Sequence, residues 1–293
     1  MSSSGNLPHS STVKARSGSE MALRVLFGVF MAVVAVMLDF LSPQWFAAVV
    51  VLVALFGARE WHRLVRDPAQ RAAAEHKPLH VQSSITGITI ALAMMVLIIA
   101  QPVLALGVLV VGAVASFVMA QRRGDNPAWH ALGVLYLGLP SLALAGLRLF
   151  AAQGALTVLG LFLIVWATDT GALVFGKLIG GKKLWPAVSP GKTWAGTIGG
   201  TFTAVAVFSL YIAFFSFNVL AALVFAACLS VVAHLGDLFE SWVKRRFGTK
   251  DSGGLIPGHG GVLDRMDSMF ACSVVLAVLV FGLHINPMFG GHS

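Results

Sequence analysis

Residues 236–268 read GDLFESWVKRRFGTKDSGGLIPGHGGVLDRMDS, and an apolar stretch lies on either side of them. The segment holds five of the 12 Asp and Glu residues of the chain, together with five Lys and Arg. Charges at the edge of a membrane core are costly unless they are solvated, paired or bound to something. Carboxylates that alternate with cations and glycines favour a divalent metal holding a phosphorylated ligand, and the simpler alternative is a solvated loop with internal salt bridges.

The composition outside this segment is that of a membrane protein. The chain has 293 residues, of which 57% are hydrophobic and 11% are charged, whereas a soluble domain carries about 25% charged residues. We therefore expect an all-α polytopic integral membrane protein. The net charge of +8 does not indicate a nucleic-acid partner, because the basic residues lie in short loops where they set topology and meet anionic lipid.

About 20 consecutive apolar residues are needed to cross a bilayer as a helix. By this criterion the sequence predicts about nine spanning helices, at 22–39, 44–58, 84–100, 102–120, 131–149, 155–175, 194–215, 218–236 and 269–286. Nineteen of the 20 Lys and Arg then fall on one face, and only Arg148 falls on the other. The positive-inside rule makes the basic face cytoplasmic, which places the N-terminus inside and the C-terminus outside.

This arrangement divides the chain into three regions. Residues 1–20 are polar and rich in Ser, which predicts a disordered cytoplasmic tail. Residues 21–150 form the N-terminal helices, with a cytoplasmic interfacial segment near 58–83 whose mix of Arg, Asp, Ala and Glu suits a helix on the lipid surface. Residues 151–293 form a C-terminal catalytic membrane domain with cytoplasmic loops at 176–193 and 237–268.

Asp237 and Asp264 bracket the second of these loops, each beside an apolar span. Helix ends are rigid places for metal ligands, and Mg²⁺ takes carboxylates together with phosphate oxygens. We expect a nucleotide triphosphate to be seated between them. The cations of the loop would complement its phosphates, and these are Lys244, Arg245, Lys250 and Arg265. His259 lies between glycines and would donate to a phosphate or assist proton movement.

The second candidate constellation is the stretch from Asp169 to Thr193. Its end, Ser189-Pro190-Gly191-Lys192-Thr193, is similar to the end of a P-loop but lacks the earlier glycine, because Pro186 occupies that position. Ser189, Lys192 and Thr193 nevertheless precede a predicted helix, whose N-terminus favours anions. Asp169 lies inside an apolar span, where an acid is a functional candidate by default; the alternative is a structural pair with Lys177 or a neighbouring helix.

The two constellations together resemble the phosphatidate cytidylyltransferases, also called CDP-diacylglycerol synthases. The residues that carry the resemblance agree with the signature of that family at every fixed position, and they are Ser241-x-Val243-Lys244-Arg245-x4-Lys250-Asp251-x-Gly253-x2-Ile256-Pro257-x-His259-Gly260-Gly261-Val262-x-Asp264-Arg265-Met266-Asp267. Asp169-Thr170-Gly171-Ala172 and Ser189-Pro190-Gly191-Lys192-Thr193-Trp194 resemble an upstream block of the family. Two departures are Leu173, where an aromatic is common, and Trp185, where a small residue is common.

The resemblance implies an enzyme that makes CDP-diacylglycerol and pyrophosphate from CTP and phosphatidic acid in the bilayer. It implies that Asp237 and Asp264 bind Mg²⁺, accompanied by K⁺, and that the protein is a homodimer. It also aligns the family's polar residues around the substrates with residues of this chain, namely Ser189, Lys192, Lys244, Arg245, Lys250, Asp251, His259 and Asp267. A bacterial inner (plasma) membrane, with the active site facing the cytoplasm, is the expected location.

Two other function classes fit parts of the pattern. A transporter or flippase for anionic lipids or phosphates would suit many spans and an intramembrane acid, although transporters often show repeats in both halves and the charged motifs here are confined to one half. A structural scaffold without catalysis would not need the dense charge of residues 237–268.

Overall fold

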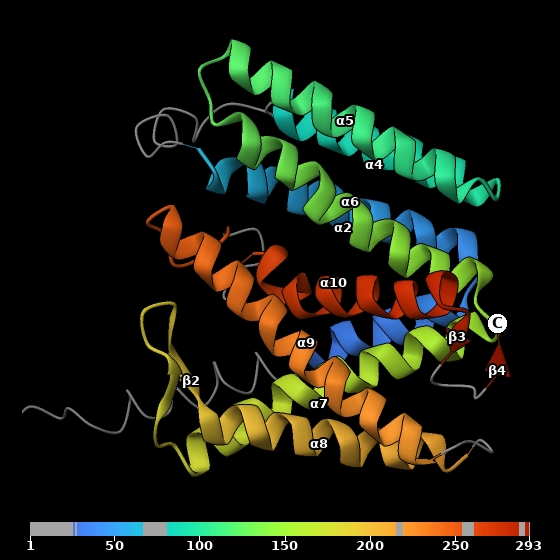
Figure 1. Ribbon diagram of the computed structural model, residues 1–293, viewed down its shortest axis with the longest axis vertical. Coiled ribbons are helices and arrows are strands. Elements are labelled where there is room, and N and C mark those ends of the chain that lie inside the picture. Colours follow the sequence, from blue (N-terminus) through green and yellow to red (C-terminus); the bar gives the residue numbers. More distant parts are fainter. Residues whose placement is uncertain are drawn as a thin grey trace, which may run out of the picture.

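The computed structural model describes residues 26, 28–66, 81–214, 219–253, 261–286 and 291–292, and it is a bundle of long helices (Figure 1). The helices are α2 (Pro43–Leu64), α4 (Val81–Ile98), α5 (Pro102–Arg122), α6 (Pro127–Phe150), α7 (Gly154–Leu178), α8 (Trp194–Ile212), α9 (Val219–Arg246) and α10 (Leu263–Ala277), which continues as the π-helix η1 (Val278–Gly282). Two short antiparallel hairpins join β1 (Lys183–Trp185) to β2 (Ser189–Thr193) and β3 (Ile285–Asn286) to β4 (Gly291–His292).

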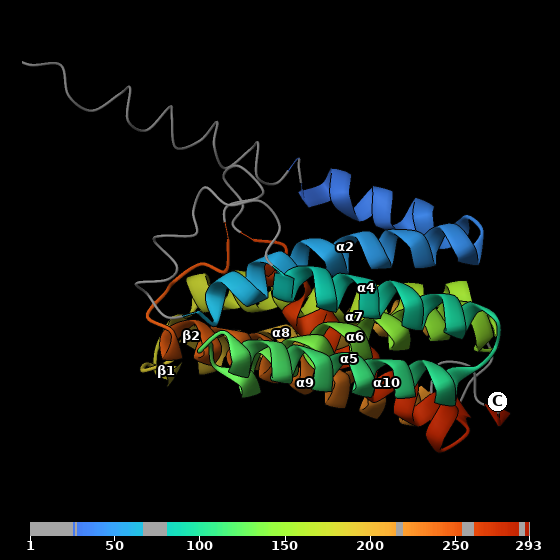
Figure 2. The same cartoon turned by 90° about the horizontal axis from the view of Figure 1, so that it is seen from above.

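Eight helices in the described part of the chain are long and apolar enough to cross a membrane, with α10 and η1 counted together as Leu263–Gly282. The all-α polytopic fold expected from composition is therefore confirmed. The first expected span, 22–39, lies partly outside the described residues. Its described part is the apolar helix Gly28–Phe40, which is shorter than the roughly 20 residues a crossing needs and lies at the edge of the bundle in Figure 2.

Consecutive helices run in opposite directions, so the connections alternate between the two ends of the bundle (Figure 1). Helices α2, α5, α7 and α9 end where α4, α6, α8 and α10 begin, and the β1–β2 hairpin lies at this same end. We call it the charged end, because every described Lys and Arg except Arg148 lies in or beside the last or first turns there. The β3–β4 hairpin lies at the opposite end.

Small residues and buried hydroxyls hold the C-terminal helices together. Helix α7 packs most extensively against α8, and a Cβ on Gly200 would stand 2.6 Å from the carbonyl oxygen of Thr168. Ser230 of α9 is buried between the two, 2.9 Å from the hydroxyl of Thr168 and 3.1 Å from that of Thr201. Because lipid provides no hydrophobic force between helices, close backbone approach and hydrogen bonds of this kind drive association.

Both segments predicted as charged loops contain more regular structure than expected. Helix α9 continues to Arg246 and α10 begins at Leu263, so Asp237 and Asp264 are helical residues. An i,i+4 pair between Glu240 and Lys244 supports the extension of α9. In the other segment, α7 reaches Leu178 and a hairpin fills residues 183–193.

The interfacial helix expected near 58–83 is not a surface element in its described part. Helix α2 continues to Leu64, and Glu60, Trp61 and His62 are buried. Trp61 donates to the carbonyl of Trp129 on α6 at 2.9 Å, and His62 contacts His130 of the same helix at 2.7 Å. Neighbouring helices thus cover this turn. Residues 67–80, the larger part of the expected segment, lie outside the described residues, so the interfacial helix stays a prediction.

We expect replacement of Arg148 by Met to destabilise the opposite end of the bundle. The Nε of Arg148 lies 3.2 Å from the carboxylate of Asp39, which is 0% exposed, and the guanidinium also donates to the carbonyls of Asp39 and Leu41 at 2.6 and 2.8 Å. Removing one partner of a buried pair leaves the other charge uncompensated, at a cost of about 3–5 kcal/mol.

Thermal denaturation in detergent measures this effect. The double variant Asp39→Asn with Arg148→Met should recover much of the loss, because it removes the stranded charge. A melting temperature of Arg148→Met equal to that of the unmodified protein would show that the pair does not stabilise the fold.

Candidate active site

Three elements at the charged end place acids and cations against one another. The Nζ of Lys192, on β2, lies 2.6 Å from Oδ2 of Asp237, on α9. The Nζ of Lys244, also on α9, lies 2.7 Å from Oδ1 of Asp264 on α10 and 3.0 Å from Oε2 of Glu240. The two carboxylates that the sequence singles out are therefore each paired with a lysine.

The β1–β2 hairpin is docked onto α9 by further contacts. Lys192 also donates to the carbonyl of His234 at 3.5 Å, and the Nε of Arg245 donates to the carbonyl of Val188 at 3.3 Å. His234 is in turn 3.2 Å from the carbonyl of Thr197 on α8. These contacts bring the two sequence constellations, which are about 50 residues apart in the chain, to one place.

Helices α9 and α10 approach closely beside this cluster. A Cβ on Gly236 would stand 2.7 Å from the carbonyl oxygen of Asp267, and the hydroxyl of Ser268 donates to the carbonyl of Ala233 at 3.1 Å. Asp267 is buried here and interacts electrostatically with Asp237 and with Glu240. A glycine before Asp237 thus lets the second turn of α10, which carries Asp267, approach α9 closely.

Asp169 joins the same electrostatic neighbourhood from α7. Its side chain is exposed although it lies within an apolar span. The charges that act on it are those of Asp267, Asp237, Lys192 and Arg265. The alternative pairing with Lys177 is not what the structure shows, and Asp169 instead faces the charged cluster.

Other predicted site residues lie elsewhere or have structural partners. Thr193 is the N-cap of α8, and its hydroxyl accepts from the backbone of Gly196 at 3.0 Å. Arg245 uses its guanidinium for the carbonyls of Val188 and Thr249. Ser189 is half-buried on β2, whereas the side chains of Lys250, Asp251 and Arg265 are exposed. His259 lies outside the described residues.

Three side chains of the site were not among the sequence candidates, namely Glu60, Glu240 and Ser252. Glu240 is fully buried against Lys244, and its i,i+4 spacing from that lysine is a signal the sequence did carry. Glu60 and Ser252 both contact the start of α10. The hydroxyl of Ser252 lies 3.5 Å from the carboxylate of Glu60, although the two residues are 192 positions apart in the sequence. Such a distant pair leaves no local pattern.

The cluster suits a hard divalent cation. Its acids are Asp169, Asp237, Glu240, Asp264 and Asp267, and they outnumber the cations Lys192, Lys244 and Arg265. The side chains of Asp237 and Asp264 are 35% and 17% exposed, whereas that of Glu240 is 0% exposed. The described residues contain no group of three or more His, Cys, Asp or Glu side chains that could hold a metal by themselves. Mg²⁺ commonly takes one or two carboxylates and completes its shell with water and phosphate oxygens.

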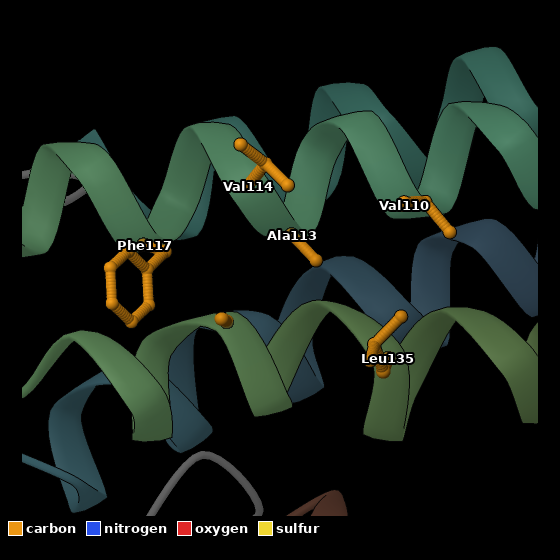
Figure 3. A pocket seen from close by; sticks show the side chains of 6 residues that line it. Val110, Ala113, Val114, Phe117 and Leu135 are labelled. Atoms are coloured by element: carbon orange, nitrogen blue, oxygen red, sulfur yellow. The ribbon is translucent and has the colours of Figure 1, made fainter.

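A separate apolar hollow of about 230 Å³ lies between α5 and α6 (Figure 3). It is lined by Val110, Ala113, Val114, Phe117, Ala131 and Leu135. These side chains offer no hydrogen-bonding group, so this hollow is not a place for a phosphorylated ligand.

The fold and the site together define a polytopic α-helical membrane protein with a carboxylate–lysine site at one end of its bundle. A profile of the cytidylyltransferase family matches residues 22–283, and the chain therefore belongs to that family. The match includes the N-terminal helices as well as the charged motifs.

Relatives named phosphatidate cytidylyltransferase are similar to part of this chain. One from Brucella suis biovar 1 (strain 1330) is 46% identical over 177 residues, which are 59% of this chain and 64% of that protein. Another, from Staphylococcus aureus (strain COL), is 44% identical over 157 residues, which are 53% of this chain and 59% of that protein. The chain thus covers less than two thirds of the length of each of these relatives.

Proposed function

We propose that this protein is a phosphatidate cytidylyltransferase, which makes CDP-diacylglycerol and pyrophosphate from CTP and phosphatidic acid. The observation that carries the proposal is the meeting of Lys192–Asp237 and Lys244–Asp264 at one end of the bundle. The printed name of the relatives and the family membership support it. A site that joins exposed acids to lysines beside lipid-facing helices suits a reaction between a charged nucleotide and a lipid.

The reaction needs positioning and charge neutralisation more than covalent chemistry. An oxygen of the lipid phosphate attacks the α-phosphorus of CTP, a new P–O–P bond forms, the bond to the β-phosphate breaks, and pyrophosphate leaves. Enzymes accelerate transfers of this kind by holding the reactants in line and by stabilising charge. A phosphate monoester is already nucleophilic at neutral pH, so no enzyme nucleophile and no obligatory general base are assigned.

In this proposal the lysines of the cluster neutralise the triphosphate and the lipid phosphate. Lys192 is paired with Asp237 and Lys244 with Asp264, and Arg265 lies one residue after Asp264. Lys250, Arg245 and Ser189 contribute further donors, and Asp169, Asp251 and Thr193 complete the polar set expected around the substrates. Asp267 and His259 are the residues that would assist proton movement.

Asp237 and Asp264 are the residues that would hold Mg²⁺, with an accompanying K⁺, because they are the accessible carboxylates of α9 and α10. The metal would supply neutralisation of the phosphate charge that builds up during transfer. Each of these acids is paired with a lysine, but the cluster as a whole holds more carboxylates than cations, which is the reason to expect a metal at this place.

We further propose that the charged end faces the cytoplasm of a bacterium, at its inner membrane, and that the protein acts as a homodimer. The cytoplasmic assignment is supported by the basic residues, of which only Arg148 among those described lies at the other end. CTP is a cytosolic reagent, which agrees with this side. The bacterial relatives support the membrane, and the dimer is implied by the family resemblance alone.

The test is pyrophosphate release by the purified protein in detergent, with CTP, phosphatidic acid and Mg²⁺ supplied together and then omitted one at a time. Release that requires all three, with CDP-diacylglycerol recovered in the organic phase, is the expected result. No release from folded protein in the presence of all three would contradict the proposal. Movement of anionic lipid across liposomes without nucleotide would then favour the transport alternative.

A further inference from the structure

Glu60 is a buried carboxylate of α2 that reaches the first turn of α10. It is 5% exposed. Its Oε1 accepts from the backbone N–H of Val262 at 3.0 Å, and its Oε2 accepts from the backbone N–H of Leu263 at 2.9 Å. The two partners are 202 and 203 residues away in the chain. The N-terminal part of the protein is thus bonded directly to the helix that carries Asp264.

The start of α10 needs such a partner. The first backbone N–H groups of a helix have no partner within the helix, and the N-cap position of α10, Val262, has no side-chain hydrogen bond to supply. A carboxylate at this place satisfies two of these groups and opposes the positive end of the helix dipole. Glu60 therefore does for α10 what a local Ser or Asp cap does for other helices.

Glu60 is also connected to Asp264 through the neighbouring backbone. The N–H of Gly261 donates to Oδ2 of Asp264 at 2.8 Å, and the N–H of Ser252 points at the same oxygen at 3.4 Å. The hydroxyl of Ser252 lies 3.5 Å from Oε2 of Glu60. Three consecutive backbone N–H groups thus donate to the two carboxylates. That of Gly261 donates to Asp264, and those of Val262 and Leu263 donate to Glu60.

Two glycines of the sequence signature are explained by this carboxylate. A Cβ on Gly253 would stand 2.6 Å from Oε1 of Glu60, and a Cβ on Gly261 would stand 2.6 Å from Oε2. Glycine is needed at both positions because a side chain would displace the carboxylate or the backbone around it. At Gly253 the three nearest atoms all belong to Glu60, whereas at Gly261 the Oγ of Ser252 would be nearer still. Neither glycine has a positive φ, so the requirement comes from these contacts and not from backbone dihedral angles.

The position of Glu60 is itself fixed by packing. The next residue, Trp61, is 0% exposed and donates to the carbonyl of Trp129 at 2.9 Å. Its ring lies 4.7 Å from that of Tyr136, which in turn lies 5.4 Å from Phe239 on α9. Helix α2 is thus held by aromatic contacts to α6, and through α6 to α9, which gives Glu60 a rigid base.

We propose that Glu60 is a positioning residue for Asp264: it sets the first turn of α10, and with it the Asp264–Lys244 pair, against the acids of α9. The functional part of this inference rests on the proposed cytidylyltransferase activity. It assigns a role to the N-terminal helices, because the site is incomplete without a carboxylate from α2. Residues that orient a metal ligand change metal affinity by about 10- to 100-fold when they are replaced.

The variant Glu60→Gln tests the proposal, because it keeps the size of the side chain and replaces one acceptor by a donor. One of the two N–H groups of Val262 and Leu263 then faces an NH₂ group. We expect faster hydrogen–deuterium exchange in peptides covering residues 261–264, with exchange in α7 and α8 unchanged. We also expect a rise of about 10-fold in the Mg²⁺ concentration that gives half-maximal activity.

His62→Gln is the matched control. His62 lies two residues further along α2, is fully buried, and contacts His130 and Thr86 rather than α10. This variant should lower the melting temperature but leave exchange at 261–264 and the Mg²⁺ dependence as in the unmodified protein. If Glu60→Gln does not fold, Gly253→Ala perturbs the same carboxylate from the other side, because the atoms nearest to its Cβ would all belong to Glu60, and it should produce the same two changes.

Each outcome decides a separate point. Unchanged exchange at 261–264 in both Glu60→Gln and Gly253→Ala would overturn the proposed contact. Faster exchange with unchanged Mg²⁺ dependence and turnover would overturn the positioning role. An unmodified protein that does not convert CTP would contradict the proposed function instead, and the exchange experiment, which needs no substrate, would still report on the Glu60 contact.

Discussion

Replacement of Asp264 by Asn should reduce pyrophosphate release by on the order of 10³-fold, in line with the loss of a group that stabilises the transition state electrostatically. In the structure, Oδ1 of Asp264 faces Lys244 at 2.7 Å and Oδ2 faces the N–H of Gly261 at 2.8 Å. Asparagine offers one oxygen and one NH₂ group, so a donor would face one of these two donors. The change also removes one of the two accessible carboxylates proposed to hold Mg²⁺.

The matched control for this variant is Asp125→Asn. Asp125 precedes α6 at the same end of the bundle, with a side chain that is 7% exposed and 3.9 Å from His130. It contacts none of the residues of the proposed site in the described structure, and its replacement should leave turnover within about 3-fold, as is usual for changes away from a site. Initial rates at saturating CTP and phosphatidic acid provide the comparison. Turnover by Asp264→Asn near that of the unmodified protein would remove Asp264 from the mechanism.

Replacement of Lys192 by Met should reduce kcat/KM for CTP by about 10²- to 10³-fold, within the range seen when one preorganised electrostatic contact is deleted. Lys192 is the contact that joins β2 to Asp237, at 2.6 Å, and to the carbonyl of His234. Without it the hairpin loses an anchor on α9, and the excess of carboxylates in the cluster grows. Both effects oppose the binding of a triphosphate.

Lys183→Met is the control, because Lys183 is an exposed lysine on β1 of the same hairpin. It removes the same charge from the same element but not from the cluster, so the rate should stay within about 2-fold, as for an ordinary surface substitution. Lys192→Arg, which keeps the charge, should recover part of the activity. Equal rates for Lys192→Met and Lys183→Met would show that only the total charge of the hairpin matters.

The sequence was sufficient for the architecture of the bundle. Long apolar stretches must be helical in a membrane, because every backbone polar group has to be satisfied within its own segment, and the eight crossing-length helices of the described chain follow these stretches. The segregation of Lys and Arg also follows from the sequence, since it depends only on the order of charged and apolar segments. The segment that contains Asp237, Lys244 and Asp264 could be recognised for the same reason, because it is continuous in the chain.

Helix ends were harder to place. The charged residues after position 236 indicate a loop by hydropathy, yet α9 continues to Arg246. Hydropathy measures transfer into lipid, whereas a helix at the end of a bundle needs only partners for its charges. Glu240 and Asp264 provide those partners for Lys244, and one of the two comes from another helix.

Only the tertiary structure showed which side chains meet. The pairing of Lys192 with Asp237 joins β2 to α9, and the pairing of Glu60 with the N–H groups of Val262 and Leu263 joins helices more than 200 residues apart. A hydrogen bond between distant segments leaves no periodic or local trace in either one. In the sequence, Glu60 is simply an acid that follows an apolar run. It caps α10 only because the fold places the uncapped N-terminus of that helix beside it. An unsatisfied N–H group is costly in such a buried place.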